Sequence, residues 1–331
     1  MTKITQKSRR NFLAGAGALG AASLILPQLS QAAVNKGRGL EYVFLSAVTQ
    51  VPFWVDHRQA LKDLEKQLDI KTTFTGPLDF DTAAQARQLD EIIARRPAGI
   101  LLFPGDPAAL ALGVERAVAA GIPVVTCVGD IPDSPRSTFC GINGFEAGKV
   151  GGELLARAIG GKGKVILGTF PAPSVLERAE GYKAVFKEKY PDIEVVDVVN
   201  DRADPSYAPT AYLQAIQAHP DIVGIGGTDG DSGKGAAIAV HEAGRSGDIK
   251  IVAMDRNEDM LSYIEDGTIH AAVAQKSYLE VYMAVHLMHW QNTESLKVLP
   301  DWKSAAVNPL PERVETGVMT ITKDNVHQFK H

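Results

Sequence analysis

The sequence predicts an α/β protein made of two doubly wound lobes, each built on a parallel sheet. Short apolar runs alternate with helical patterns along most of the chain, and the runs are continuous rather than alternating in polarity. Continuous runs are typical of parallel strands covered by helices on both faces. One break in this rhythm, between Cys127 and Phe145, divides the chain into two such units.

The expected strands are rich in β-branched residues, and turns containing Gly or Pro separate them from the helices. We expect strands at residues 42–48, 71–74, 99–103, 123–127, 137–141, 164–167, 194–198, 222–226, 250–254 and 271–274. We expect helices at residues 53–68, 82–95, 107–120, 146–159, 175–189 and 230–243.

The break holds a Pro-rich stretch, 130–136, and a short strand, but no helical pattern. Neighbouring parallel strands need a crossover of a dozen or more residues, usually helical. We therefore interpret this segment as the chain leaving one lobe and entering the other near Ile142 and Asn143.

Residues 1–32 have the features of a twin-arginine export signal. Arg9 and Arg10 are followed by Asn-Phe-Leu, by an uncharged run that ends at Leu26, and by a small-residue cleavage site at 30–32. The apolar run is too short and too rich in Gly and Ala for a membrane span. The alternative is a basic N-terminus that continues into an amphipathic helix. The signal predicts a periplasmic protein exported already folded.

The charge of the chain excludes some classes of partner. The signal contains four of the 34 bases and no acid, so 30 bases and 39 acids remain in the mature chain, a net charge of −9. Such an acidic chain is not expected to bind nucleic acid or an anionic membrane surface.

The two cysteines, Cys127 and Cys140, do not form a disulfide framework. Export makes a single bridge chemically possible, because both lie near the ends of successive expected strands. We expect two buried free thiols.

Motifs for cofactors or catalysis fail on spacing. The stretch 224–229 has Asp where a dinucleotide fingerprint needs Gly, 233–235 lacks most of a P-loop, and 229–233 departs from a calcium loop at its fifth position. His286 and His289 share a helical face without a third ligand, which favours a surface pair over a metal site. We expect no cofactor and no metal.

An aromatic pair stands out. Phe53 and Trp54 follow the first expected strand and open the first helix. Open α/β sheets bind ligands at this carboxyl edge, and aromatic faces suit the C–H faces of sugar rings. The alternative is that both rings belong to the core.

At this point the chain resembles a known family, the periplasmic substrate-binding proteins of sugar-type ABC importers, in the ribose-binding (type I) branch. The resemblance covers nearly the whole mature chain, and it depends on the order and spacing of several fragments. These are residues 52–54, 121–126, 130–134, 143–148, 176–182, 218–221, 252–255 and 274–275. Related cytoplasmic repressors carry a DNA-binding helix-turn-helix where this chain has its export signal.

The resemblance implies a set of ligand-binding residues. Phe53 and Trp54 match the aromatic pair that sandwiches the sugar, and Arg178 matches an arginine that donates to its oxygens; the alternative for Arg178 is a structural salt bridge. Asp255 matches a carboxylate that accepts hydroxyl groups, and Gln275 matches a hinge amide. The set is completed by Thr228, which replaces a family asparagine, by Phe103, which occupies a first-lobe Asn position, and by Asn143.

The chain also departs from the family. Val128 and Gly129 stand where ribose-binding relatives have an Asp and a polar neighbour, and Ile142 replaces a polar hinge residue. The first lobe has therefore lost much of its hydroxyl-binding set while the second keeps its own. Since an unpaired polar group in a closed pocket costs about 1–3 kcal/mol, ribose is not the expected ligand.

The resemblance implies a receptor without a catalytic step, monomeric, that closes on a sugar-like molecule and delivers it to an ABC permease in the inner membrane. The chain would cross between the lobes near Ile142, Gln275 and Val307. The N-terminal lobe would comprise 40–142 and 276–306, and the C-terminal lobe 143–275 and 307–331. The alternative ligand is a polyol or a signalling furanose. The alternative functions are a sensory receptor that acts through a membrane chemoreceptor or kinase, and an exported enzyme.

Overall fold

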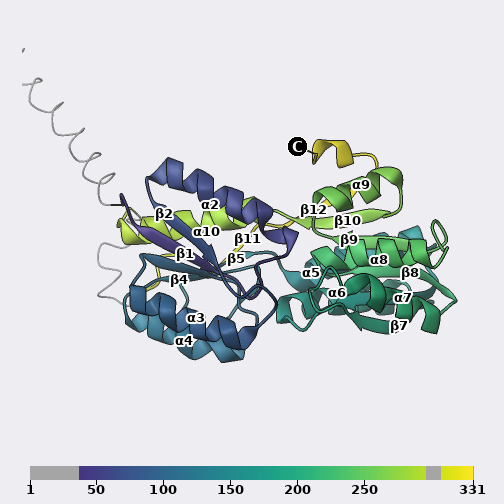
Figure 1. Cartoon of the computed structure of the whole chain (residues 1–331), viewed down its shortest axis with the longest axis horizontal. Coiled ribbons are helices and arrows are strands. Elements are labelled where there is room, and N and C mark those ends of the chain that lie inside the picture. Colours follow the sequence, from purple (N-terminus) through teal and green to yellow (C-terminus); the bar gives the residue numbers. More distant parts are fainter. Residues whose placement is uncertain (1–36, 296–306, 331) are drawn as a thin grey trace, which may run out of the picture.

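The computed structural model describes residues 37–295 and 307–330. Two α/β lobes lie end to end, each with one six-stranded sheet between layers of helices (Figure 1). The expected fold class is confirmed. The expected export signal at residues 1–32 lies outside the described residues, as do positions 296–306. No helix among the described residues combines the length and apolarity needed to cross a membrane.

The first lobe has the strand order β11-β5-β4-β3-β1-β2, and all of these pairings are parallel. Helices α2 and α10 cover one face of the sheet, and α3 and α4 cover the other (Figure 1). The elements are β1 (Glu41–Leu45), η1 (Pro52–Trp54), α2 (Val55–Leu68), β2 (Lys71–Thr75), α3 (Thr82–Arg95), β3 (Gly99–Leu102), α4 (Pro107–Ala119), β4 (Val124–Cys127), β5 (Thr138–Gly141), α10 (Ser277–Asn292) and β11 (Arg313–Glu315).

The second lobe has the order β12-β10-β9-β8-β6-β7, with β12 antiparallel to β10 and the other pairings parallel. Helices α5 and α6 cover one face, and α7, α8 and α9 the other. The elements are α5 (Gly144–Ala158), β6 (Gly163–Thr169), α6 (Pro173–Lys189), β7 (Ile193–Asn200), α7 (Ala208–Ala218), β8 (Ile222–Gly227), α8 (Gly230–Glu242), β9 (Lys250–Met254), α9 (Glu258–Asp266), β10 (Ala271–Gln275), β12 (Val318–Thr322) and η2 (Val326–Gln328).

The central strands are buried on both faces, which explains their continuous apolar runs. In β1, Tyr42 and Phe44 pack toward α2 and α10, whereas Val43 and Leu45 pack toward α3 and α4. All four are completely buried. Burial of each large apolar side chain stabilises the fold by roughly 1.5–3 kcal/mol, so the central strands hold both helix layers against the sheet.

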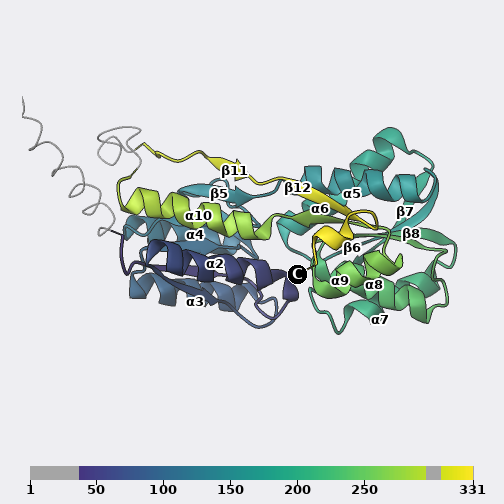
Figure 2. The ribbon, with the colours of Figure 1, turned by 90° about the horizontal axis from the view of Figure 1, so that it is seen from above.

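The chain crosses between the lobes three times. The first crossing lies at Ile142 and Asn143, between β5 and α5, and the second at Lys276, between β10 and α10. The third connects β11 to β12 through Thr316 and Gly317. Figure 2 shows this last segment running along the molecule from one lobe to the other. The expected third crossing near Val307 is therefore corrected, because residues 313–315 pair with β5 in the first sheet.

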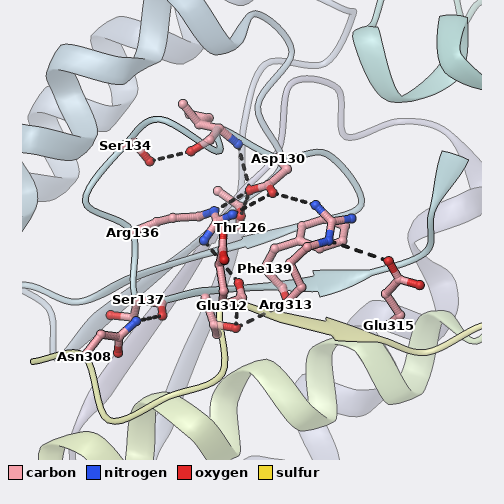
Figure 3. A network of polar contacts seen from close by, with 12 residues as sticks. Thr126, Asp130, Ser134, Arg136, Ser137, Phe139, Asn308, Glu312, Arg313 and Glu315 are labelled. Carbon is pink, nitrogen blue, oxygen red and sulfur yellow. Dashed lines mark hydrogen bonds and ion pairs between the residues drawn. The ribbon is translucent and has the colours of Figure 1, made fainter.

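A polar network fixes β11 to the first lobe (Figure 3). The Arg136 side chain is only 3% exposed; it pairs with Asp130 at 2.5 Å and donates from Nη1 to the Glu312 carbonyl. Arg313 reaches the other oxygen of Asp130, at 3.1 Å. Asn308 donates to the Ser137 carbonyl at 2.6 Å. These contacts explain why this part of the chain stays with the first lobe.

The two cysteines face each other in the first sheet. Cys127 on β4 and Cys140 on β5 are register partners, and both are buried and free. Burial raises the pKa of the Cys140 thiol to about 12, and it also raises the pKa of the Cys127 thiol well above its usual value. Both therefore remain uncharged at neutral pH and unreactive as nucleophiles.

Candidate functional site

A pocket lies between the lobes, at the carboxyl ends of strands from both sheets. It holds about 580 Å³ of unfilled space, part of it open to solvent. Residues just after β3, β4, β6 and β9 line it, as does the end of β10. Ligands of open α/β sheets bind at this edge, so the pocket is the candidate site.

Aromatic residues form much of the first-lobe wall. Phe53, Trp54 and Phe103 all line the pocket. Trp54 is 1% exposed, and its ring lies 4.7 Å from Phe53 and 5.6 Å from Phe103, between centroids. The buried Trp54 Nε1 has no hydrogen-bond partner among the described residues. The core position and the ligand-site position are therefore compatible for Phe53 and Trp54, because both rings pack in the core and also line the cavity.

A buried ionisable pair supports this wall. His57 on α2 packs against Phe53 and Trp54, and its Nδ1 lies 3.2 Å from the Phe53 carbonyl oxygen. Its Nε2 lies 3.8 Å from Glu280 on α10, and both side chains are fully buried. Thr316 of the third crossing donates to Glu280 at 3.4 Å. The aromatic wall is thus linked to the hinge through polar contacts.

Arg178 supplies hydrogen-bond donors from the second lobe. It lies on α6, which approaches α5 so closely that a Cβ added at Gly148 would lie 2.0 Å from the Arg178 carbonyl oxygen. Its guanidinium is 2% exposed and donates from Nη1 to the Thr228 carbonyl at 2.8 Å. Nε and Nη2 are buried without a partner among the described residues. Since guanidinium donors in proteins are normally paired, these two point to a ligand acceptor.

Asp255 and Gln275 stand beside this guanidinium. Asp255 follows β9 and accepts from Gln275 Nε2 at 2.7 Å, while Gln275 Oε1 is buried and has no partner within residues 37–295 and 307–330. Burial raises the pKa of Asp255 to about 6, and the positive charge of Arg178 opposes this rise. The group is therefore mostly ionised at neutral pH, as an acceptor for ligand hydroxyl groups requires.

Two further acids at the pocket were not predicted from the sequence. Asp229 caps α8 by accepting from the backbone N–H groups of Asp231 and Ser232. Asp231, in the first turn, also lines the pocket; burial, then the charges of Asp229 and Asp255, raise its pKa to about 7. Their position directly after a strand was the available signal, but the stretch was tested only as a metal or nucleotide motif.

Two expected residues do not line this pocket. The Thr228 hydroxyl is buried and donates to the Gly168 carbonyl at 2.7 Å, so it holds β8 against β6. The Asn143 side chain accepts from the Glu146 N–H and caps α5 at the first crossing. Both therefore have structural partners within the chain. The other six expected residues are brought together around the cavity.

Three residues of the pocket have left-handed backbone conformations without being glycine. These are Val128 at φ +66°, Asp255 at φ +68° and Ala203 at φ +53°. Such conformations cost about 1–3 kcal/mol each and persist where the surrounding structure imposes them, most often at functional sites. In β-branched Val128 the conformation is especially unfavourable.

Contacts between the lobes lie at the rim of the pocket. Arg256, which follows β9, pairs with Asp56 on α2 at 2.8 Å. Phe80 of the first lobe meets Phe170 of the second at 5.2 Å between ring centroids. The lobes are therefore closed on one another.

The two histidines set aside as a surface pair lie on α10, but His286 is corrected to a buried residue. It is 9% exposed and packs against Tyr282 and Trp290. His289 is partly exposed and lies 3.3 Å from the Tyr42 hydroxyl. Across the two described ranges, no group of three or more His, Cys, Asp or Glu residues could hold a metal ion.

Two α/β lobes, three crossings and a pocket between the carboxyl ends of both sheets define a two-lobed solute-binding protein. The chain belongs to the periplasmic binding protein family, whose domain matches residues 42–291. This confirms the family expected from the sequence.

Relatives and solved structures agree with this assignment. The ribose import binding protein of Bacillus subtilis is 26% identical over 265 residues, 79% of this chain and 85% of the relative. A xylitol-binding protein of Mycolicibacterium smegmatis is 28% identical over 251 residues, 74% of this chain and 67% of the relative. An ABC transporter solute-binding protein from Burkholderia graminis, solved with D-arabinose, matches with a TM-score of 0.80 and 25% identity, covering 89% of this chain and 99% of that one.

Proposed function

We propose that this protein is a periplasmic receptor that captures a sugar-like molecule between its lobes and delivers it to an ABC importer. The observation that carries the proposal is the buried Arg178 guanidinium, which lies beside Asp255 and Gln275. Its Nε and Nη2 have no hydrogen-bond partner in the part of the chain that the structure describes. A planar donor fork next to a carboxylate and an amide complements vicinal hydroxyl groups and a ring oxygen.

Capture uses closure of the lobes and involves no catalytic step. A ligand bound to both lobes holds them together, and the three crossings at Ile142–Asn143, Lys276 and Thr316–Gly317 are the segments about which the lobes rotate. The closed form adds the Asp56–Arg256 ion pair across the rim. A permease can then distinguish the loaded receptor from the empty one by its shape.

The relatives support a polyhydroxylated ligand. The similar proteins are named for binding ribose and xylitol, and one was solved in complex with D-arabinose. These compounds share several neighbouring hydroxyl groups, which the second-lobe side chains suit. Export by the twin-arginine route, a monomeric state and docking to an inner-membrane permease belong to the same proposal, supported by the N-terminal motif and the family.

A thermal-shift screen of the mature protein against pentoses, hexoses and polyols tests the proposal. A ligand that binds only the native state stabilises it in proportion to the logarithm of its concentration over Kd. We expect at least one sugar or polyol to raise Tm in wild-type protein but not in Arg178→Met. If no member of the panel changes Tm, the proposed ligand class is wrong.

A further inference from the structure

The two walls of the pocket differ sharply in polarity. The first-lobe side chains that line it are all apolar or aromatic, and their only heteroatom is Trp54 Nε1. They are Val48, Val51, Pro52, Phe53, Trp54, Phe103 and Val128. Pro52 is exposed, Phe53 is partly buried, and the other five are buried in the core. This wall can contact hydrocarbon but offers side-chain partners to almost no hydroxyl group.

The second-lobe wall carries the polar groups. Arg178 Nε, Arg178 Nη2 and Gln275 Oε1 are buried without partners among the described residues. Asp255 and Asp231 add carboxylates on the same side of the cavity. A ligand can therefore satisfy several hydroxyl groups at once, provided that they lie along one edge.

This asymmetry limits the number and placement of ligand hydroxyl groups. A hydroxyl turned toward Val51, Phe103 or Val128 would lose its water without gaining a side-chain partner, which weakens binding by roughly tenfold to a hundredfold. A methyl or methylene group at the same place would instead gain apolar contact. The first-lobe wall thus selects against fully hydroxylated sugars.

We propose that the ligand is a deoxy sugar, with hydroxyl groups along one edge for Arg178, Asp255 and Gln275 and a hydrocarbon edge against the first lobe. The inference rests on the proposed function, because it takes for granted that the cleft binds a sugar-like compound. It adds one feature of the ligand, which lacks a hydroxyl group on the edge that faces the first lobe.

Calorimetric titration with matched sugar pairs tests the inference. The pairs are L-rhamnose and L-mannose, L-fucose and L-galactose, 6-deoxy-D-glucose and D-glucose, and 2-deoxy-D-ribose and D-ribose. We expect the deoxy member of the pair that binds most tightly to exceed its partner at least tenfold in affinity. If a hydroxylated member, or any other fully hydroxylated sugar, binds as tightly as the best deoxy sugar, the inference is wrong while the receptor function stands. If no sugar of either kind binds, and no polyol of the thermal-shift screen binds either, the proposed function itself fails.

A substitution in the first-lobe wall provides a second test. Val51 is 7% exposed and occupies the position before η1, where it makes no side-chain cap. Asn is well suited to such a position, so Val51→Asn should fold and add a polar group to the apolar wall. We expect the preference for the deoxy sugar to fall at least tenfold.

Val55→Asn is the matched control, because Val55 lies four residues further on, is 62% exposed and does not line this pocket. It should retain the wild-type preference. Unliganded Tm values of both variants establish that each is folded. An unchanged preference in folded Val51→Asn would contradict the assignment of this wall as the determinant of specificity.

Discussion

Replacing Arg178 by Met tests the candidate site most directly. Met keeps the length of the apolar stem and removes every donor. Among the described residues the guanidinium donates one hydrogen bond, to the Thr228 carbonyl, and leaves Nε and Nη2 for a ligand. Hydrogen bonds that involve a charged group contribute about 1.5–3 kcal/mol each. Loss of two therefore weakens binding by at least about 3 kcal/mol, which is on the order of a hundredfold in Kd.

The unliganded protein should respond differently. Because the buried guanidinium is incompletely paired in the empty pocket, its removal is expected to change Tm of the free protein only modestly. Arg178 also opposes the rise in the pKa of Asp255, so this pKa should increase further in the variant. Loss of binding with retained stability is the signature of a ligand-contacting residue.

The assay is calorimetric titration with the compound that gives the largest Tm increase in the screen. Arg157→Met is the matched control, since the Arg157 side chain is 70% exposed on α5 and pairs with Glu153 at the surface, away from the pocket. It should bind as the wild type does. Wild-type affinity in folded Arg178→Met would refute the assignment of this guanidinium to the ligand.

Three further predictions follow from other parts of the chain. The mature protein without reductant should have the mass of two free thiols at Cys127 and Cys140; a mass lower by two protons would indicate a bridge. Because the pKa of Asp231 is raised from 3.8 to about 7 in the folded state, its contribution to stability is present below about pH 4 and lost as pH rises to 7. Asp231→Asn should therefore raise Tm by several degrees at about pH 8 and little at about pH 4, and equal changes at both would contradict this origin. Replacing Arg9 and Arg10 together by Lys should leave the precursor in the cytoplasm, as cell fractionation would detect; normal periplasmic levels would exclude twin-arginine export.

The sequence predicted the two sheets because the strands are buried on both faces. Runs such as Gly99–Leu102 and Val124–Cys127 are almost entirely apolar, with Thr126 as the one polar residue in the two strands, and every residue in them is buried. The lack of a helical crossover after Cys127 indicated the place where the chain enters α5. These are local signals, readable along the chain.

The third crossing could not be predicted from such local signals. Strand β11 has only three residues, with an exposed–intermediate–exposed pattern, so it has no apolar run of its own. Its place in the first sheet depends on Asp130 and Arg136, residues more than 170 positions earlier. Thr228 shows the same limit within the site. Its residue type suits a ligand contact, but the fold places the Gly168 carbonyl where its hydroxyl can donate.

The three crossings determine when the protein can finish folding during synthesis. The edge strands β11 and β12, Arg313–Glu315 and Val318–Thr322, complete the two sheets and are synthesised after all the strands with which they share those sheets. Neither lobe is therefore a finished N-terminal unit that could fold first, as domains of consecutive sequence do. Under the proposed export route, which carries folded proteins, the signal is synthesised well before the strands that complete both sheets, so export has to follow their synthesis. A chain truncated before Arg313 would then carry the signal but lack the strands that complete its two sheets, and it would not be exported.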